Sequence, residues 1–144
     1  MDLLLDVNVV VDICTQRRPH FEAARDAVAA CQAAGGRIWL YVGSVQTLEY
    51  VTRAELSRQL AEENVFPSQR QLFQRTIELL HEFAKDKQWL AALAEEGSVF
   101  DSEDPEDEQL IRALRRFGEG KIKILTRDAD LIEKCAQAIT PEES

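Results

Sequence analysis

The chain has 144 residues, a hydrophobic share of 45% and a formal net charge of −9. This length and composition suit one globular domain with a sizeable core, so we expect residues 1–144 to form a single domain. The acidic charge argues against broad, non-specific nucleic-acid binding, which depends on Lys and Arg neutralising phosphates. It would suit a basic protein partner.

No apolar run approaches the roughly 20 residues that span a bilayer, and no basic leader precedes the first apolar run. Cys14, Cys31 and Cys135 are odd in number and lack C-x-x-C spacing. We therefore expect reduced thiols in a cytoplasmic protein with no membrane association.

The first part of the chain alternates strand-like and helical patterns. The apolar run Leu3–Leu5 predicts a buried strand ending near Asp6, followed by a short helix or a continued strand. Residues 21–34 have helical spacing and end at two glycines. Residues 37–42 predict a second strand.

The middle of the chain predicts helices. One should run from Val45 to about Glu62, with Ser44 as a plausible N-cap. A second should follow Pro67, which fits the first turn of a helix. Residues 85–96 favour a further short helix.

Towards the carboxyl terminus, residues 97–100 predict a connector or short strand, and Pro105 suits the start of a helix. The clearest strand covers residues 122–126 and leads into a helix that begins near Asp128. We expect residues 140–144 to form a frayed tail.

Strands separated by helices predict parallel βαβ units and hence an α/β fold. Such sheets place their sites beyond the carboxyl ends of the strands. Asp6 and Asp128 each follow a predicted strand, so we expect the two carboxylates to meet at one edge of the sheet.

Further acids stand at Glu49, inside an apolar helical pattern, and in the run from Asp101 to Glu108. A carboxylate near a core is costly to desolvate unless it is paired, and one divalent cation could pair several. Asp104 and Asp107 could face the same side of a helix. Alternatively, Asp104 could be an N-cap, with Pro105 as the first helical residue and Asp107 in the first turn.

Four motifs, in this order along the chain, resemble those of the PIN-domain family, and most nearly its VapC-like toxins, which are metal-dependent ribonucleases. The motifs are LLDVNVVVD at residues 4–12 with RRPHF at 17–21, Leu-Glu-Tyr around Glu49, DPED at 104–107, and ILTRDADL at 124–131. The resemblance implies a three-layer α/β/α fold with a central, mostly parallel sheet.

The resemblance also implies a metal site built from carboxylates. Its catalytic acids would be Asp6, Glu49, Asp107 and Asp128, all of them metal ligands, with Asp104 as a helper of Asp107. The supporting polar side chains would be Asn8 and Thr126. We interpret Asp12 and Asp130 as peripheral to this site.

Carboxylate oxygens suit Mg²⁺ or Mn²⁺, whereas zinc usually recruits His or Cys, and His20 and His81 lie outside all four motifs. The implied reaction is hydrolysis of RNA phosphodiester bonds by one or two ions. Candidate contacts to the RNA are Arg17, Arg18, Arg53, Arg112, Arg115, Arg116 and Arg127, although the residues of 112–116 could equally form intrahelical ion pairs.

In VapC-like proteins the equivalent of the middle helices forms a homodimer and binds an antitoxin, and the resemblance implies both partners here. A rival hypothesis is a PIN-like interaction module that cleaves nothing. Phosphotransfer domains fit less well. A haloacid-dehalogenase type would need D-x-D where this chain has Asp6-Val7-Asn8, and a receiver type would need a lysine where it has Arg127.

Overall fold

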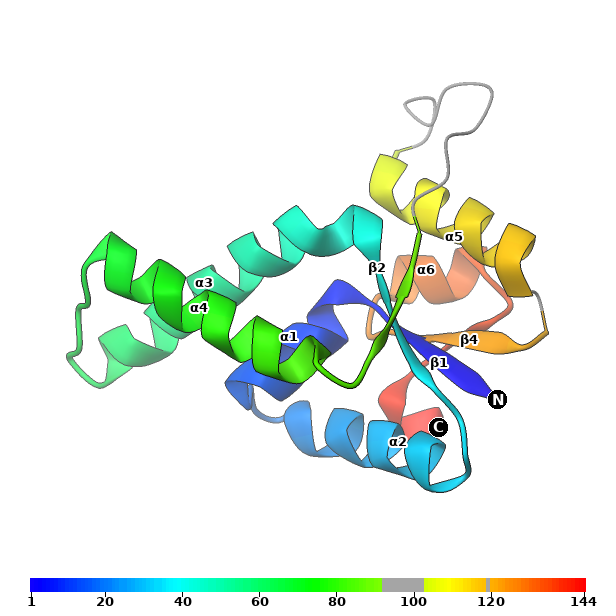
Figure 1. Ribbon diagram of the computed structural model, residues 1–144, viewed down its shortest axis with the longest axis horizontal. Helices are drawn as coiled ribbons and strands as arrows, with labels where there is room; N and C mark the ends of the chain where they lie inside the picture. The colour runs from blue at the N-terminus through cyan, green and yellow to red at the C-terminus, as the bar shows by residue number, and fades with distance from the viewer. Residues whose placement is uncertain (92–102, 119) are drawn as a thin grey trace.

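The computed structural model describes residues 1–91, 103–118 and 120–144, with the backbone alone at residues 117 and 118. Figure 1 shows the arrangement of the helices and strands. In chain order they are β1 (Asp2–Leu5), α1 (Val7–Thr15), α2 (Phe21–Ala33), β2 (Ile38–Tyr41), a 3₁₀ turn (Val42–Ser44), α3 (Val45–Glu62), α4 (Gln69–Ala84), β3 (Gln88–Leu90), α5 (Pro105–Gly118), β4 (Ile122–Leu125), α6 (Ala129–Lys134), β5 (Ala138–Ile139) and a last 3₁₀ turn (Pro141–Glu143).

The described strands form one sheet in the order β3-β2-β1-β4-β5, and every neighbouring pair is parallel. β1 is therefore the central strand. Leu4 of β1 is aligned with Trp39 on β2 and with Ile124 on β4. The predicted α/β class with a parallel central sheet is confirmed.

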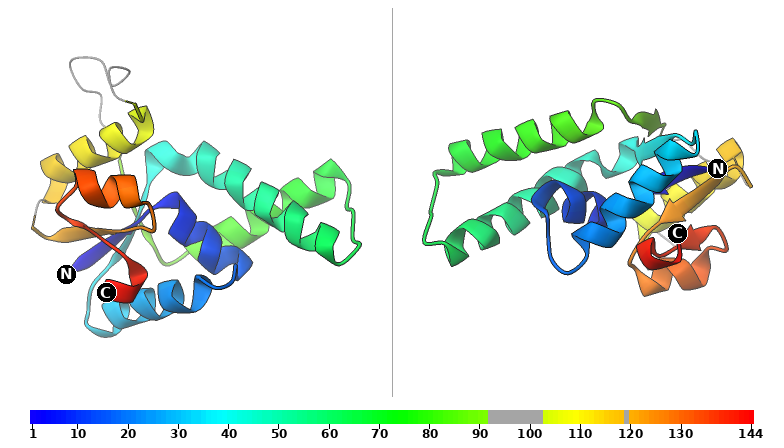
Figure 2. Two further views of the ribbon diagram at one scale, coloured as in Figure 1. Left: turned by 180° about the vertical axis from the view of Figure 1, so that it is seen from behind. Right: turned by 90° about the horizontal axis from the view of Figure 1, so that it is seen from below.

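Helices cover both faces of the sheet, which gives three layers (Figures 1 and 2). Leu4 faces a cluster that contains Leu114 of α5 and Leu131 of α6. Its neighbours Leu3 and Leu5 face the opposite cluster, with apolar residues of α1 and α2. Because β1 is covered on both sides, its apolar residues run without alternation, as is usual for parallel sheets.

Helices α3 and α4 lie side by side and extend away from the sheet (Figure 2). Their outer parts leave several apolar side chains uncovered. Phe66, in the connection between them, is 76% exposed, and Phe73 and Ile77 of α4 are 48% and 41% exposed. None of the helices in the described ranges is both long and apolar enough to cross a bilayer.

Three local predictions are wrong. Pro67 lies outside α4, because Ser68 is the N-cap and forms a reciprocal capping box with Gln71. Residues 88–90 form β3 rather than a helix, because they pair with β2 at the edge of the sheet. The terminus is ordered, since Pro141 is buried and its 3₁₀ turn packs against α2.

The short strand β5 was not predicted from the sequence. The other helices and strands agree with the sequence patterns to within a residue or two. After Asp6 the chain forms a helix, which decides between the two alternatives there. The expectations for residues 92–96 and 97–100 lie outside the described residues.

Candidate functional site

Asp6 is fixed by both of its carboxylate oxygens where β1 ends and α1 begins. Its Oδ1 accepts the Val7 backbone N–H at 2.8 Å, so the residue is the N-cap of α1. Its Oδ2 accepts the Thr126 hydroxyl at 2.7 Å and the Asn8 side-chain amide at 3.3 Å. Both of the predicted supporting residues therefore contact Asp6.

Thr126 and Asp128 occupy the equivalent place after β4. The Thr126 side chain is completely buried, and its hydroxyl accepts the Asp128 backbone N–H at 3.0 Å. Asp128 caps α6 through the Asp130 N–H, which lies 2.9 Å from its Oδ1. Because β1 and β4 are adjacent and parallel, with Leu5 aligned to Leu125, the two acids follow neighbouring strand ends.

The third acidic position lies at the start of α5. Oδ1 of Asp104 accepts the Asp107 backbone N–H at 3.1 Å. Asp104 is therefore an N-cap, with Pro105 as the first helical residue, which is the second of the two alternatives left open by the sequence. Asp107 is only 9% exposed.

The carboxyl group of Asp107 is electrostatically unfavourable in its charged form. Burial is the main cause that raises its pKa, which reaches about 7, and the negative charges of Asp104, Asp6 and Asp128 raise it further. Lys134 acts weakly in the other direction. The charges of Asp6, Asp107 and Asp128 therefore act on one another, although the residues come from three separate elements.

The pKa of Asp6 is also raised. Burial raises its pKa most, the hydrogen bonds from Thr126 and Val7 lower it, and the charges of Asp128 and Glu106 raise it again. The net direction is upward. The sequence patterns thus correctly predict that Asp6 and Asp128 lie near each other.

Glu106 is a further acid of this region that the sequence analysis did not single out. Its two carboxylate oxygens accept the hydroxyl groups of Ser44 at 2.7 Å and Thr47 at 2.9 Å. It thereby connects the start of α5 to the start of α3. Ser44 is the N-cap residue of α3, as predicted, but its hydroxyl is directed to Glu106 and makes no capping hydrogen bond. No local pattern identifies Glu106, because the run 103–108 is acidic throughout.

Glu49 has a different environment. Its Oε1 lies 2.8 Å from Nε of Arg53, one turn later on α3. These two atoms make no directed hydrogen bond, so the contact is a charge pair. Glu49 also lines a largely apolar cavity of about 370 Å³ beside α4 and Trp89. Its charge is not among the main causes of the raised pKa of Asp6 or Asp107.

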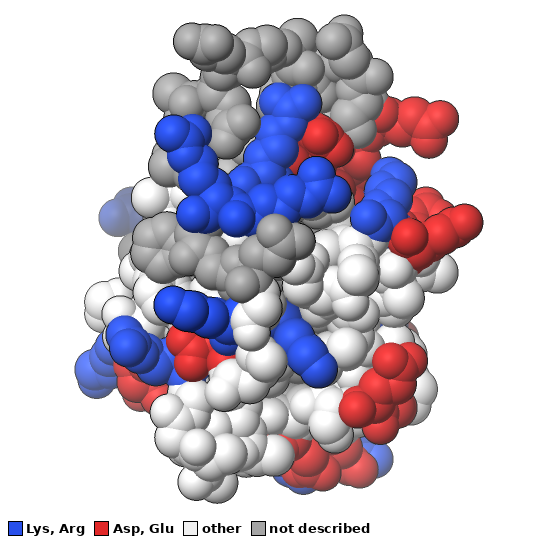
Figure 3. Space-filling model, turned by 90° about the vertical axis from the view of Figure 1, so that its right-hand side faces the viewer, with Lys and Arg blue, Asp and Glu red and all other residues white. Residues whose placement is uncertain are grey.

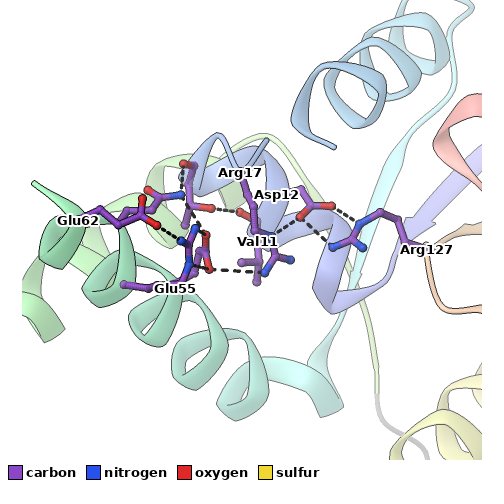
Figure 4. Close-up of polar contacts among 9 residues, drawn as sticks. Val11, Asp12, Arg17, Glu55, Glu62 and Arg127 are labelled. Atoms are coloured by element: carbon purple, nitrogen blue, oxygen red, sulfur yellow. Dashed lines mark hydrogen bonds and ion pairs between the residues drawn. The ribbon is translucent and has the colours of Figure 1, made fainter. Parts of the chain in front are cut away.

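Most of the predicted RNA-binding arginines are engaged in ion pairs. Arg17 and Arg127 both bind Asp12, at 2.7 Å and 2.6 Å (Figure 4). Arg112 pairs with Glu108 at 3.0 Å, which confirms the intrahelical alternative for this residue. Asp12, interpreted as peripheral, is completely buried.

Figure 3 shows Lys and Arg side chains gathered on one end of the molecule. The exposed cations at the carboxyl end of α5 and along β4 are Arg115, Arg116, Lys121 and Lys123. This end contains the amino ends of β1 and β4, because Asp2 is aligned with Ile122. These cations therefore lie near the amino ends of the strands, whereas Asp6 and Asp128 follow the carboxyl ends.

The acids of the site fit a hard divalent cation in donor type and in charge. Mg²⁺ keeps several of its waters and takes only one or two protein carboxylates, so it does not need a closed ligand set. Within the described ranges, no three His, Cys, Asp or Glu side chains are arranged as a preformed ligand set. The mutual repulsion at Asp107 is the feature that a cation would relieve.

Comparison of the sequence with models of known protein families and with curated proteins gives no match. The fold, the carboxylates and the sequence motifs are therefore the features that bear on its function.

Proposed function

We propose that this chain is a PIN-like endoribonuclease that depends on Mg²⁺ or Mn²⁺ and acts as the toxin of a toxin–antitoxin pair. The observation that carries the proposal is the environment of Asp107. Its nearly buried carboxyl group has a pKa of about 7, raised in part by the charges of Asp6 and Asp128. Groups with strongly perturbed pKa values that also lie near like charges are concentrated at functional sites.

Asp6, Asp107 and Asp128 would hold the cation, with Asp104 and Glu49 as the further acids of the proposed site. A bound Mg²⁺ or Mn²⁺ would supply charge stabilisation at the phosphate and lower the pKa of an attacking water. The chain itself holds Asp6 in one orientation, because Val7, Asn8 and Thr126 all donate to its carboxylate. That orientation is set before any ligand arrives.

Without a cation, Asp107 would keep its proton to a higher pH than an ordinary carboxyl group, because its pKa is raised to about 7. This proton would have to leave before the carboxylate could ligate a metal. Because the charged form is disfavoured by burial and by neighbouring acids, a cation would shift this group towards its ionised form.

The rival function, an interaction module without catalysis, is favoured by the apolar surface of the α3–α4 pair. Phe66, Phe73 and Ile77 are exposed there, and the cavity beside Glu49 is largely apolar. The same surface supports the proposed homodimer and antitoxin, because exposed apolar patches commonly mark protein interfaces. A partner surface is compatible with a nuclease, so the decisive question is whether metal binding and cleavage occur.

The test compares wild type with Asp6→Asn and with Asp130→Asn, a matched change at an exposed acid in the first turn of α6. Mn²⁺ binding is measured by calorimetry, and cleavage of a structured RNA is followed with Mn²⁺ and with excess EDTA. We expect binding and cleavage by wild type and by Asp130→Asn, and loss of both in Asp6→Asn. If wild type neither binds Mn²⁺ nor cleaves RNA, the interaction module is the better description.

A further inference from the structure

Two arginines form ion pairs with Asp12, in the last turn of α1. The Asp12 side chain is completely buried. Its Oδ2 lies 2.6 Å from Nε of Arg127, and its Oδ1 lies 3.1 Å from the Arg127 Nη2 and 2.7 Å from Nε of Arg17 (Figure 4). Removing one partner of such a buried pair leaves an uncompensated charge, so the arrangement is strongly constrained.

Arg127 is the residue between Thr126 and Asp128, so whatever holds Arg127 also holds the loop that carries Asp128. The Arg127 side chain is bound in a bidentate manner by Asp12, and its backbone N–H donates to Oδ1 of Asn8 at 3.2 Å. Asn8 and Asp12 are four residues apart on α1, so they lie on the same face of the helix. One face of α1 therefore binds both the backbone N–H and the side chain of Arg127 in this loop.

The other side of Asp12 is anchored to the α3 helix. Arg17 lies 3.7 Å from Oε2 of Glu55, and Glu55 is bound by Arg58 through two hydrogen bonds. The Asp12 carboxylate is thus bound by Arg127 on one side and, through Arg17 and Glu55, connected to α3 on the other. Four successive contacts, through Glu55, Arg17 and Asp12, separate Arg58 from Arg127, so Arg58 serves as an internal comparison.

We propose that Asp12 is a positioning residue. Through Arg127 it fixes the loop after β4, so that the Asp128 carboxylate stays beside Asp6 and Asp107. The role in metal binding rests on the proposed function, whereas the effect on the loop does not. Residues that orient metal ligands through hydrogen bonds typically change metal affinity 10–100-fold when they are mutated.

The loop is tested first, without metal, by hydrogen exchange of the Arg127 and Asp128 backbone amides. Both amides donate to side chains of the site, Asn8 and Thr126. We expect protection factors at least about tenfold lower in Asp12→Asn and in Arg127→Gln, with the amides of β1 unchanged. Arg58→Gln makes the same chemical change in the same network and should leave both loop amides at their wild-type protection. Unchanged protection in Asp12→Asn and Arg127→Gln would overturn the proposal.

Mn²⁺ affinity is then measured by calorimetry on the same folded proteins. We expect binding about 10–100-fold weaker in Asp12→Asn and Arg127→Gln, and unchanged in Arg58→Gln. A faster-exchanging loop with wild-type Mn²⁺ affinity would overturn the positioning role. If the wild type binds no Mn²⁺, the proposed function fails while the exchange result still decides whether Asp12 holds the loop. If Asp12→Asn does not fold, Arg127→Gln decides both questions, because the Arg127 side chain is already 25% exposed.

Discussion

The hydroxyl of Thr126 donates to Oδ2 of Asp6 across 2.7 Å, although 120 positions separate the two residues in the chain. The same hydroxyl accepts the backbone N–H of Asp128 at 3.0 Å. One buried oxygen atom therefore joins the ends of β1 and β4, and it fixes one acid while orienting the backbone of another.

We expect Thr126→Val to lower the free energy of unfolding by about 1–3 kcal/mol, because it leaves the partly buried Asp128 N–H without its acceptor and removes a donor to Asp6. Urea denaturation would measure the loss. Thr52→Val is the matched control. The Thr52 hydroxyl is completely buried and has no hydrogen-bond partner among the described residues, so its removal should be neutral or stabilising. Equal losses in the two variants would contradict this account of Thr126.

The raised pKa of Asp107 predicts a pH-dependent stability without metal. The folded protein keeps the proton up to a pKa of about 7, whereas an unfolded aspartate loses it near pH 4. Between these values the folded state binds more protons, so its stability falls as the pH rises, by at most about 1.4 kcal/mol per pH unit. Relative to wild type, Asp107→Asn should therefore be more stable at pH 8 than at pH 5. Denaturation at both pH values tests this, and an identical difference at each would refute it.

Metal binding should distinguish Asp107 from Asp104. Asp104 caps α5 through the Asp107 N–H, and Asn is as good an N-cap as Asp. We expect Asp104→Asn to retain helix stability and most of the Mn²⁺ affinity, while Asp107→Asn loses considerably more affinity. Calorimetry on the two variants makes the comparison, and the reverse order would assign the main third ligand to Asp104.

Glu49→Gln tests the acid whose charge is not among the main causes of the raised pKa of Asp6 or Asp107. Its pair with Arg53 is partly exposed and lies within one helix, so we expect the free energy of unfolding to change by less than about 1 kcal/mol. If Glu49 is the fourth acid of the proposed site, RNA cleavage should fall while the fold is retained. Full cleavage of RNA by folded Glu49→Gln would show that Glu49 does not belong to the catalytic site. Glu49 would then only line the cavity beside α4.

Predictions for the sheet succeed where a local pattern carries the information. Leu3–Leu5 predicts a strand because its three consecutive apolar side chains can be buried on both faces of a sheet. Residues 122–126 predict a strand because Ile122, Ile124 and Leu125 are apolar. Predictions fail where a distant partner decides the structure. Gln88–Leu90 becomes a strand because β2 offers an open edge, and Pro141 is covered because α2 lies beside it.

The site shows the same division. The local patterns are sufficient to predict that Asp6 and Asp128 follow strands of a parallel sheet and meet at one edge of it, because strand ends and the α/β alternation can be read locally. Four relationships depend on the packed structure: β1 and β4 are neighbours, Asp107 is buried near both acids, Glu106 contacts Ser44, and Asp12 binds two arginines. These contacts join residues that are far apart in the chain, and their burial and charge coupling arise only when the helices pack against the sheet.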